Sequence, residues 1–413
     1  MSPDAQSGAA RRTARRLDGI GAALDAAGLA ERPVAVLDLD AFDANADDLA
    51  RRAAGVPIRV ASKSLRVRAL IERACAHPGM QGVLAYTLPE ALWLAENGVR
   101  DIVVAYPTVD RAAIARLAAS ETARAEVTVM VDCVAHLDLI EDAARGALGA
   151  GQRVRVAIEL DAAYAPHARL RFGALRSPIA DAGAAVALVR EITRRPGLEL
   201  DGIMAYEGQI AGVGNAGSAR YAYAVRAMQK LSAAEIARRR AEVVAAVADV
   251  APLRFVNAGG TGSIETSGAE EAVTEIAAGS GLIGPALFDG YRAFAPSPAL
   301  FLGFSVVRRP GPRVATLLGG GWIASGVPGP DRLPALTHPA GLRYAPQEAA
   351  GEVQTPVMGE AAERLRIGDT VWLRPAKAGE AAEHAPSYVL VAGERPEVFD
   401  VVPTYRGEGR MFL

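Results

Sequence analysis

The chain has 413 residues, more than most single domains contain, so its length predicts two domains. Apolar residues make up 51% of the sequence and charged residues 22%, which is typical of a globular protein and excludes a disordered or fibrous chain. The formal net charge of −2 gives no electrostatic reason to expect binding to nucleic acid or to a membrane. We therefore expect a small molecule as the main ligand.

Cysteine use and the N-terminal segment bear on where the protein works. Cys75 and Cys133 are the two cysteines, and no metal-ligand spacing surrounds them, which predicts free thiols in a reducing, cytoplasmic setting. The first residues contain arginines but no apolar stretch follows, so we expect no secretory signal. No apolar run approaches the roughly 18 residues of a membrane span, so we expect none.

Short apolar runs alternate with segments of helical period from about residue 58 to residue 292. Strands that are apolar along their whole length are buried on both faces, as in a parallel sheet covered by helices. Eight of them predict an α/β fold with a closed (β/α)8 TIM barrel, although an open doubly wound sheet has the same alternation. An earlier run at 34–40 would be a ninth strand and is assigned to another domain. The eight runs are 58–63, 82–86, 101–107, 126–132, 153–160, 200–206, 253–260 and 274–280.

The composition and the periodicity of the sequence change after Phe294. Glycine and proline there separate short β-rich runs such as RVATLLGG, TVWLRP and YVLVAG, and no helical period is evident. This pattern is typical of an all-β domain, and Pro296 lies near the expected boundary. We therefore assign residues 41–292 to the barrel, and residues 1–40 with 293–413 to a second, C-terminal all-β domain.

Polar residues and glycines lie where the barrel strands are predicted to end, which is where (β/α)8 barrels form their active sites. Lys63 ends the first strand and Tyr206 the sixth. Glycine-rich turns with hydroxyl residues follow the seventh and eighth strands, NAGGTGS at 257–263 and AGSGLIGP at 278–285. Such turns suit a phosphate, because backbone N–H groups and hydroxyls can point to it. Glycine also permits a positive φ, which is the structural alternative.

A lysine on the same face as a phosphate site narrows the choice of ligand. The chain uses arginine at most basic positions, so a lysine at a strand end needs a reason. Pyridoxal 5′-phosphate has an aldehyde that forms a Schiff base with a lysine amine and a phosphate that needs hydrogen-bond donors. Arginine cannot replace this lysine, because its guanidinium does not deprotonate. Lys63 therefore predicts a pyridoxal phosphate cofactor, and a solvated lysine on the barrel rim is the alternative.

Segments along almost the whole chain, from about residue 34 to the C-terminus, resemble one enzyme family. The sequence is similar to the fold-type III pyridoxal phosphate enzymes, in the branch of D-threonine aldolases and D-serine dehydratases within the alanine racemase N-terminal-domain superfamily. The segments that carry the resemblance are VASKSLRV, AYTLPEALWLAENG, DIVVAYPTVD, GIMAYEGQ, FVNAGGTGSIE, AGSGLIGP, GGGWIASG, AGEVQTP and PTYRGEGR.

The resemblance implies a role for each residue that matches a family motif. Lys63 would be the cofactor lysine, and Tyr206, in its YEG motif, would lie beside the cofactor. The family's arginine in an R-x-G pattern faces the pyridine nitrogen and leaves it unprotonated; it matches Arg171, with Arg169 as the alternative. The phosphate turns would contribute Gly260, Thr261, Gly262, Ser280 and Gly281.

The chain departs from the family where some relatives carry metal ligands. Those relatives have a histidine and, two residues later, an aspartate or cysteine, whereas Pro375 and Lys377 occupy these positions in RPAKAGE. Neither residue is a plausible ligand, so metal ligands stay unknown, with Glu380 or His384 as substitutes. We interpret Lys377 as a second catalytic residue whose ammonium replaces the cation, and an exposed loop lysine is the alternative.

Other polar residues stay outside the predicted catalytic set. Trp322, Glu352 and Gln354 resemble segments near the cofactor in relatives but would equally close a domain interface. Asp132 and His136 follow the fourth strand, where they would cap the next helix.

These features predict a pyridoxal phosphate-dependent lyase for β-hydroxy-α-amino acids. The resemblance implies that these substrates have the D configuration. Aldol cleavage to glycine and an aldehyde is favoured over dehydration to a 2-oxo acid, because loss of hydroxide needs strong acid or metal assistance. An amino-acid racemase is the main rival and would need a tyrosine from the other subunit, for which Tyr405 is the candidate. The added β domain argues against a non-catalytic cofactor carrier. The resemblance also implies a homodimer with shared active sites.

Overall fold

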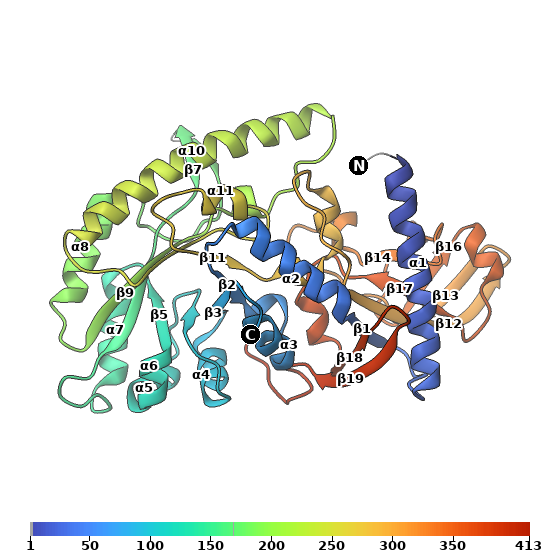
Figure 1. Ribbon diagram of the computed structural model, residues 1–413, viewed down its shortest axis with the longest axis horizontal. Coiled ribbons are helices and arrows are strands. Elements are labelled where there is room, and N and C mark those ends of the chain that lie inside the picture. The colour runs from blue at the N-terminus through green and yellow to red at the C-terminus, as the bar shows by residue number, and fades with distance from the viewer. Residues whose placement is uncertain (1–2, 168) are drawn as a thin grey trace.

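Eight parallel strands close into a barrel in the computed structural model, which describes residues 3–167 and 169–413 (Figure 1). Every residue of β2 and β5 is buried, because helices cover the outside of the barrel and side chains fill its inside. The predicted (β/α)8 barrel is confirmed, and the open doubly wound sheet is excluded. The strands are β2 (Ile58–Ala61), β3 (Met80–Ala85), β4 (Ile102–Val104), β5 (Val127–Val131), β6 (Val154–Glu159), β9 (Leu198–Ala205), β10 (Phe255–Ala258) and β11 (Glu275–Ala278).

Local signals in the sequence explain where the barrel helices begin. Thr87 precedes α4, and its hydroxyl accepts a hydrogen bond from Glu90 N, while Asp110 caps α5 in the same way. The apolar faces of the helices then pack on the barrel in one continuous core. The helices are α2 (Leu39–Ala53), α3 (Arg68–Cys75), α4 (Leu88–Glu96), α5 (Arg111–Ala119), α6 (Glu121–Glu126), α7 (Val134–Ala144), α8 (Ala182–Thr193), α9 (Gly208–Ala211), α10 (Arg220–Ala248), α11 (Ile264–Gly268) and α12 (Ser280–Ile283).

The second domain is built on a largely antiparallel sheet, and the surplus N-terminal strand β1 (Val34–Asp38) lies in it. β1 pairs antiparallel with β12 and parallel with β18. Helix α1 (Pro3–Ala26) packs on this sheet through Leu17, Ile20 and Leu24 (Figure 1). The other strands are β12 (Leu300–Gly311), β13 (Val314–Leu318), β14 (Ala335–His338), β15 (Arg343–Tyr344), β16 (Gln354–Met358), β17 (Thr370–Arg374), β18 (Ser387–Ala392) and β19 (Glu397–Pro403).

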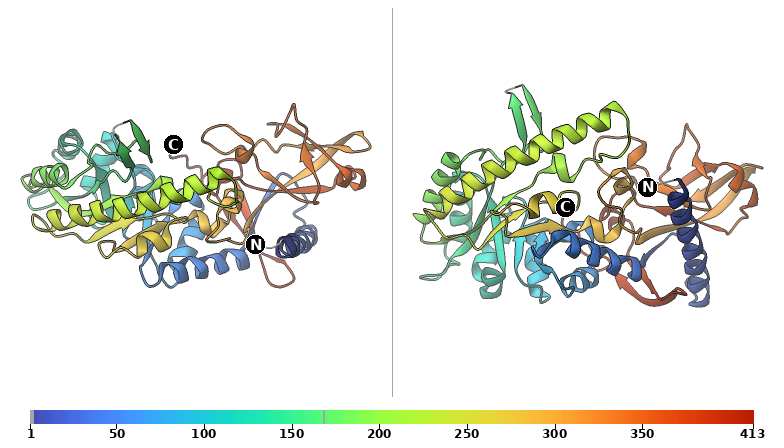
Figure 2. Two further views of the ribbon diagram at one scale, coloured as in Figure 1. Left: turned by 90° about the horizontal axis from the view of Figure 1, so that it is seen from above. Right: turned by 45° about the horizontal axis from the view of Figure 1, so that its top comes forward.

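Short elements complete the chain. A small hairpin leaves the barrel after β6 and returns before α8 (Figure 2). Across the described residues, no helix combines the length and the apolar character that a membrane span requires. The hairpin is β7 (Tyr164–His167) with β8 (Leu170–Phe172), and the 3-10 helices are η1 (Ser62–Ser64), η2 (Ala286–Gly290), η3 (Pro330–Arg332), η4 (Glu360–Arg364) and η5 (Glu380–Glu383).

Buried polar contacts hold the two domains together around the barrel mouth. The Asn45 side chain donates to Leu282 O at 3.0 Å and to Ser297 O at 2.8 Å. Arg374, at the end of β17, donates from Nε to Gly284 O at 2.7 Å. The chain then returns from the second domain to the barrel, where the Tyr405 ring packs edge-on against Trp93 of α4. Loops of the second domain therefore lie fixed at the carboxyl ends of the barrel strands.

Candidate active site

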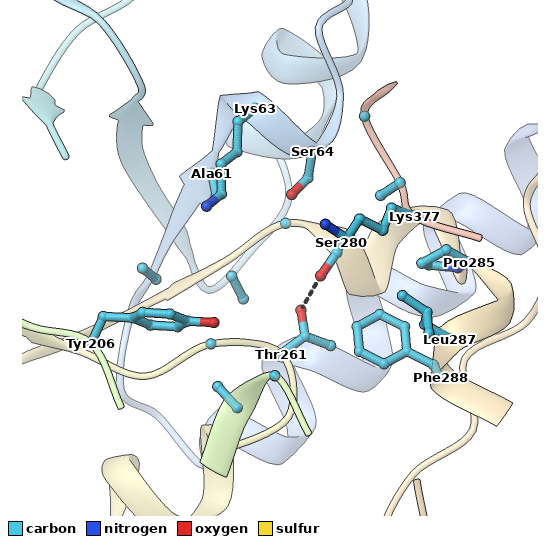
Figure 3. A pocket seen from close by; sticks show the side chains of 18 of the residues that line it. Ala61, Lys63, Ser64, Tyr206, Thr261, Ser280, Pro285, Leu287, Phe288 and Lys377 are labelled. Carbon is cyan, nitrogen blue, oxygen red and sulfur yellow. Dashed lines mark hydrogen bonds between the residues drawn. The ribbon is translucent and has the colours of Figure 1, made fainter. Parts of the chain in front are cut away.

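A cavity of about 700 Å³ lies at the carboxyl ends of the barrel strands and is bounded on one side by loops of the second domain. This volume suits a cofactor and a small substrate together. Lys63, Tyr206 and the turns after β10 and β11 contribute to its lining from the barrel. Lys377 contributes from the second domain (Figure 3).

Lys63 lies in η1, directly after β2, and its amine reaches into the cavity. Its Nζ donates a hydrogen bond to Tyr106 Oη at 2.9 Å. Burial alone would raise the pKa of Tyr106, but the charges of Lys63 and Arg176 prevail and hold that pKa below its usual value. Tyr106 was not among the predicted site residues, although its place in DIVVAYP, just after the third barrel strand, was a signal for it.

The turns after β10 and β11 bring two hydroxyls together. Thr261 Oγ1 lies 3.2 Å from Ser280 Oγ, and Gly281 N donates to Thr261 Oγ1 at 3.1 Å. Both hydroxyl residues line the cavity with Gly260 (Figure 3). A Cβ at Gly260 would lie 2.9 Å from Ala211 Cβ and 3.1 Å from a carbon of the Tyr206 ring, so a larger residue would disturb the cavity wall.

Gly262 and Gly281 are not among the described residues that line the cavity. A Cβ at Gly262 would lie 2.3 Å from Ala211 O, and one at Gly281 would lie 2.8 Å from Thr261 Cγ2. These two glycines allow the turns to pack closely, which places Thr261. The predicted contact of their backbone N–H groups with a phosphate stays a prediction.

The arginines among the described cavity-lining residues are Arg66, Arg176 and Arg332, and not the predicted Arg171. Arg171 lies in the exposed hairpin strand β8, pairs with Asp161 at 2.8 Å, and is not among the described residues that line the cavity. Arg169 is also exposed on this hairpin. The Arg176 guanidinium lies 5.3 Å from the centroid of the Tyr106 ring and 5.0 Å from that of Tyr206. The R-x-G pattern pointed to the loop that carries Arg176, and the position of Arg171 outside the described lining does not support its predicted contact with the pyridine nitrogen.

The loop at residues 375–380 carries Lys377 into the cavity and is fixed on both sides by the barrel. Ala286 N donates to Pro375 O at 3.0 Å. A Cβ at Gly379 would lie only 1.8 Å from Lys63 O, so this loop touches the turn that holds Lys63. Lys377 Nζ donates to Ser325 Oγ at 3.0 Å, and Glu380 also lines the cavity. Ser325 was missed, although it lies in the GGGWIASG segment that carries part of the resemblance, because only Trp322 was singled out there.

Several other candidates lie outside the described cavity lining. His384 stacks on Trp322 with ring centroids 5.1 Å apart, and burial together with Arg406 lowers the pKa of His384. Tyr405 is 1% exposed and donates to Glu90 of its own chain at 2.8 Å. A tyrosine engaged in this way inside its own chain is not available to a second subunit.

Among the described residues, the group with the spacing of metal ligands is Asp132, Cys133 and His136, whose ligand atoms lie within 4.8 Å of one another. It follows β5 at the barrel rim, and its residues are not part of the described cavity lining. Asp132 N contacts His136 Nδ1 at 3.3 Å, which fits a local contact at the start of α7. Glu352 and Gln354 also lie outside the described lining.

Comparison with known proteins places the chain in a family. The family model described as "Alanine racemase, N-terminal domain" matches residues 37–286, more than half of the chain. The chain belongs to this family. The match includes the barrel, Lys63 and the turns with Thr261 and Ser280.

Curated relatives of this family member are aldolases. A D-threonine aldolase from an Arthrobacter species is 28% identical over 329 residues, which cover 76% of this chain and 77% of that protein. A 3-hydroxy-D-aspartate aldolase from Paracoccus denitrificans is 29% identical over 238 residues, which cover 56% of this chain and 55% of that protein.

Solved structures share the fold of the whole chain. D-threonine aldolase from Filomicrobium marinum superposes with a TM-score of 0.76 at 22% identity, over 91% of this chain and 95% of that one. D-threo-3-hydroxyaspartate dehydratase from Delftia sp. HT23 gives a TM-score of 0.68 at 21% identity, over 91% and 97% of the two chains. Both the barrel and the second domain therefore recur together in these proteins.

Proposed function

We propose that this family member is a pyridoxal phosphate-dependent lyase that acts on β-hydroxy-α-amino acids, with aldol cleavage of a D-configured substrate as its main reaction. The observation that carries the proposal is the placement of the Lys63 amine and the paired Thr261 and Ser280 hydroxyls in one cavity of suitable size. The curated relatives, which are aldolases of D-threonine and of 3-hydroxy-D-aspartate, support the substrate class.

The residues of the cavity fit pyridoxal phosphate chemically. Lys63 supplies a primary amine for the aldehyde, and Thr261 and Ser280 supply hydroxyls for the phosphate. Arg176 takes the role that the resemblance gave to Arg171, because it is the arginine beside the Tyr206 ring. When bound, pyridoxal phosphate supplies an electron-withdrawing group that weakens the bonds at the α-carbon of the substrate.

Two lysines of the chain act on the substrate from two sides of the cavity. Lys63 is held by Tyr106 and would hold the cofactor, and its amine would also move a proton at the α-carbon of the substrate. Lys377 lies in the second-domain loop across the cavity, at a position where the resemblance implies a metal ligand in relatives that use a metal. Its ammonium would bind the β-hydroxyl oxygen and stabilise negative charge there as the hydroxyl loses its proton.

Product analysis tests this proposal. Purified protein with pyridoxal phosphate is incubated with D- and L-threonine, phenylserine and serine, and the products are identified. We expect glycine and an aldehyde from the D isomers of threonine and phenylserine. A 2-oxo acid as the main product would instead support a dehydratase, and an inverted amino acid a racemase.

Metal dependence gives a second prediction. Because Lys377 occupies the place of a divalent cation, we expect aldol cleavage to persist within about twofold after treatment with EDTA. Lys377→Met removes the charge but keeps much of the length, and we expect it to lower kcat at least about 100-fold, as the loss of an electrostatic stabiliser does. Loss of wild-type activity in EDTA and its return with Mn²⁺ would contradict this role.

A further inference from the structure

Three side chains of the second domain form a connected group at the cavity mouth. Ser325 Oγ donates to Glu380 Oε1 and accepts from Lys377 Nζ, at 3.0 Å. Ser325 N donates to Glu380 Oε2 at 2.7 Å, so both carboxylate oxygens are held. The hydroxyl proton of Ser325 therefore points to the carboxylate, and an ammonium lies on the other side of the same oxygen.

The aldol cleavage needs a group that accepts the β-hydroxyl proton, and few groups in the cavity can do so. The carboxylates among the described lining residues are Glu380 and Asp331. The Asp331 side chain is 59% exposed and contacts Arg332 at 3.3 Å, so it faces solvent and a cation rather than a substrate. Burial raises the pKa of Tyr206 to about 12, which makes it a poor acceptor, and Tyr106 is already engaged by Lys63.

We propose that Ser325 takes the proton of the substrate's β-hydroxyl and passes its own proton to Glu380, an assignment that rests on the proposed function. The O–H bond of the substrate breaks, and its electron pair forms the second bond of the aldehyde C=O. The Cα–Cβ bond breaks, and its electron pair stays with the glycine fragment. The α-carbon of that fragment takes up one proton to give glycine, and Glu380 later returns its proton to solvent, so protons and electrons balance.

The packing of the loop supports this assignment. Lys377 and Glu380 lie on one short segment that touches the Lys63 turn at Gly379 and the segment after β11 at Pro375. Figure 3 shows Lys63 and Lys377 entering the cavity from different sides, with Ser280 beside Lys377 and its partner Thr261 below both lysines in this view. A substrate in this cavity would lie between the Lys63 turn and the second-domain loop. The ammonium of Lys377, whose Nζ lies 3.0 Å from Ser325 Oγ, would stabilise negative charge on the oxygen that Ser325 deprotonates.

Variants of the two residues test the relay. We expect Glu380→Gln and Ser325→Ala each to lower kcat for D-phenylserine cleavage at least about 100-fold, the usual range for loss of a general base. Glu380→Asp and Ser325→Thr should recover part of this loss. Asp331→Asn, at the other cavity carboxylate, should stay within about threefold of wild type. In Glu380→Gln the KM for D-phenylserine should stay within about threefold of wild type while kcat falls, a split that a merely structural role would not cause.

Cofactor binding, followed by fluorescence titration, provides a readout other than activity. The dissociation constant of pyridoxal phosphate should stay within about threefold of wild type in all five variants. If wild type is active and Glu380→Gln has the same kcat, the relay is overturned but the proposed function is not. Marked cofactor loss in Glu380→Gln or Ser325→Ala would also overturn it, because these residues would then belong to the cofactor site. A wild type that binds the cofactor but cleaves no β-hydroxy amino acid would overturn the proposed function, and the relay with it.

Discussion

Glu90 is a buried carboxyl group next to the turn that carries Lys63. It is fully buried and accepts hydrogen bonds from Tyr86 N at 2.7 Å and from Tyr405 Oη at 2.8 Å. Burial disfavours the carboxylate more than these hydrogen bonds favour it, which raises the pKa of Glu90 to about 7. A single residue thus links the C-terminal segment, helix α4 and the Lys63 turn.

This raised pKa predicts how stability depends on pH. The folded protein binds the Glu90 proton more tightly than the unfolded chain, whose carboxyl has a pKa near 4.5. The stabilisation is therefore present below about pH 4.5 and is lost as the pH rises through about 7. Between pH 5 and pH 8, we expect wild type to lose about 2–3 kcal/mol more unfolding free energy than Glu90→Gln does. Urea unfolding at both pH values measures this, and equal losses in the two proteins would contradict it.

The loop at 375–380 is the part of the second domain that places its side chains in the cavity next to the Lys63 turn. Its contact with the Lys63 turn leaves no space for a side chain at Gly379, because a Cβ there would lie 1.8 Å from Lys63 O. A backbone atom cannot move aside as a flexible side chain can. The position of Lys377 and Glu380 relative to Lys63 thus depends on one glycine.

Gly379→Ala tests this dependence. We expect the added methyl group to displace the loop and to lower kcat/KM about 100-fold, since a shift of about 1 Å in a catalytic group has this effect. Circular dichroism should stay that of wild type. Gly311→Ala is the matched control, because a Cβ at Gly311 has no neighbour within 4 Å. If both variants kept wild-type kcat/KM, the loop would not position the catalytic groups.

At the scale of the whole molecule, buried hydrogen bonds rather than apolar contacts alone lock the barrel to the second domain. Arg374 donates to Gly284 O at 2.7 Å and to Pro285 O at 2.9 Å, and its other nitrogen pairs with Asp289 at 2.9 Å. These carbonyls belong to the segment that follows the turn with Ser280. The interface therefore also supports one wall of the cavity. The homodimer expected from the resemblance stays a prediction, which sedimentation velocity would test.

Arg374→Met should weaken the contact between the barrel and the second domain. The substitution leaves buried carbonyl groups without donors, so we expect unfolding free energy to fall by about 2–4 kcal/mol in urea titrations. Arg313→Met is the control, because Arg313 pairs with Glu360 and Glu363 at the surface and should change stability by less than about 1 kcal/mol. Equal effects of the two substitutions would mean that the interface depends on other contacts.

Sequence reasoning located the barrel, because its strands are short apolar runs that alternate with segments of helical period. It also placed Lys63 and Tyr206 at strand ends, since these follow directly from the strand boundaries. It chose Arg171, with Arg169 as the alternative, and did not consider Arg176, because spacing does not show that the β7–β8 hairpin carries Arg171 away from the cavity lining. It missed Ser325, which meets Glu380 only through tertiary packing. Contacts between distant loops leave no periodic signal in the sequence.

The chain has three lysines, Lys63, Lys230 and Lys377, which allows a direct test of the central claim. The protein is incubated with pyridoxal phosphate, reduced with sodium borohydride, digested with a protease that does not depend on lysine, and analysed by mass spectrometry. We predict a phosphopyridoxyl group on the peptide that contains Lys63, and its absence from that peptide in Lys63→Arg. A label confined to Lys377 or Lys230, or no label at all, would contradict the account.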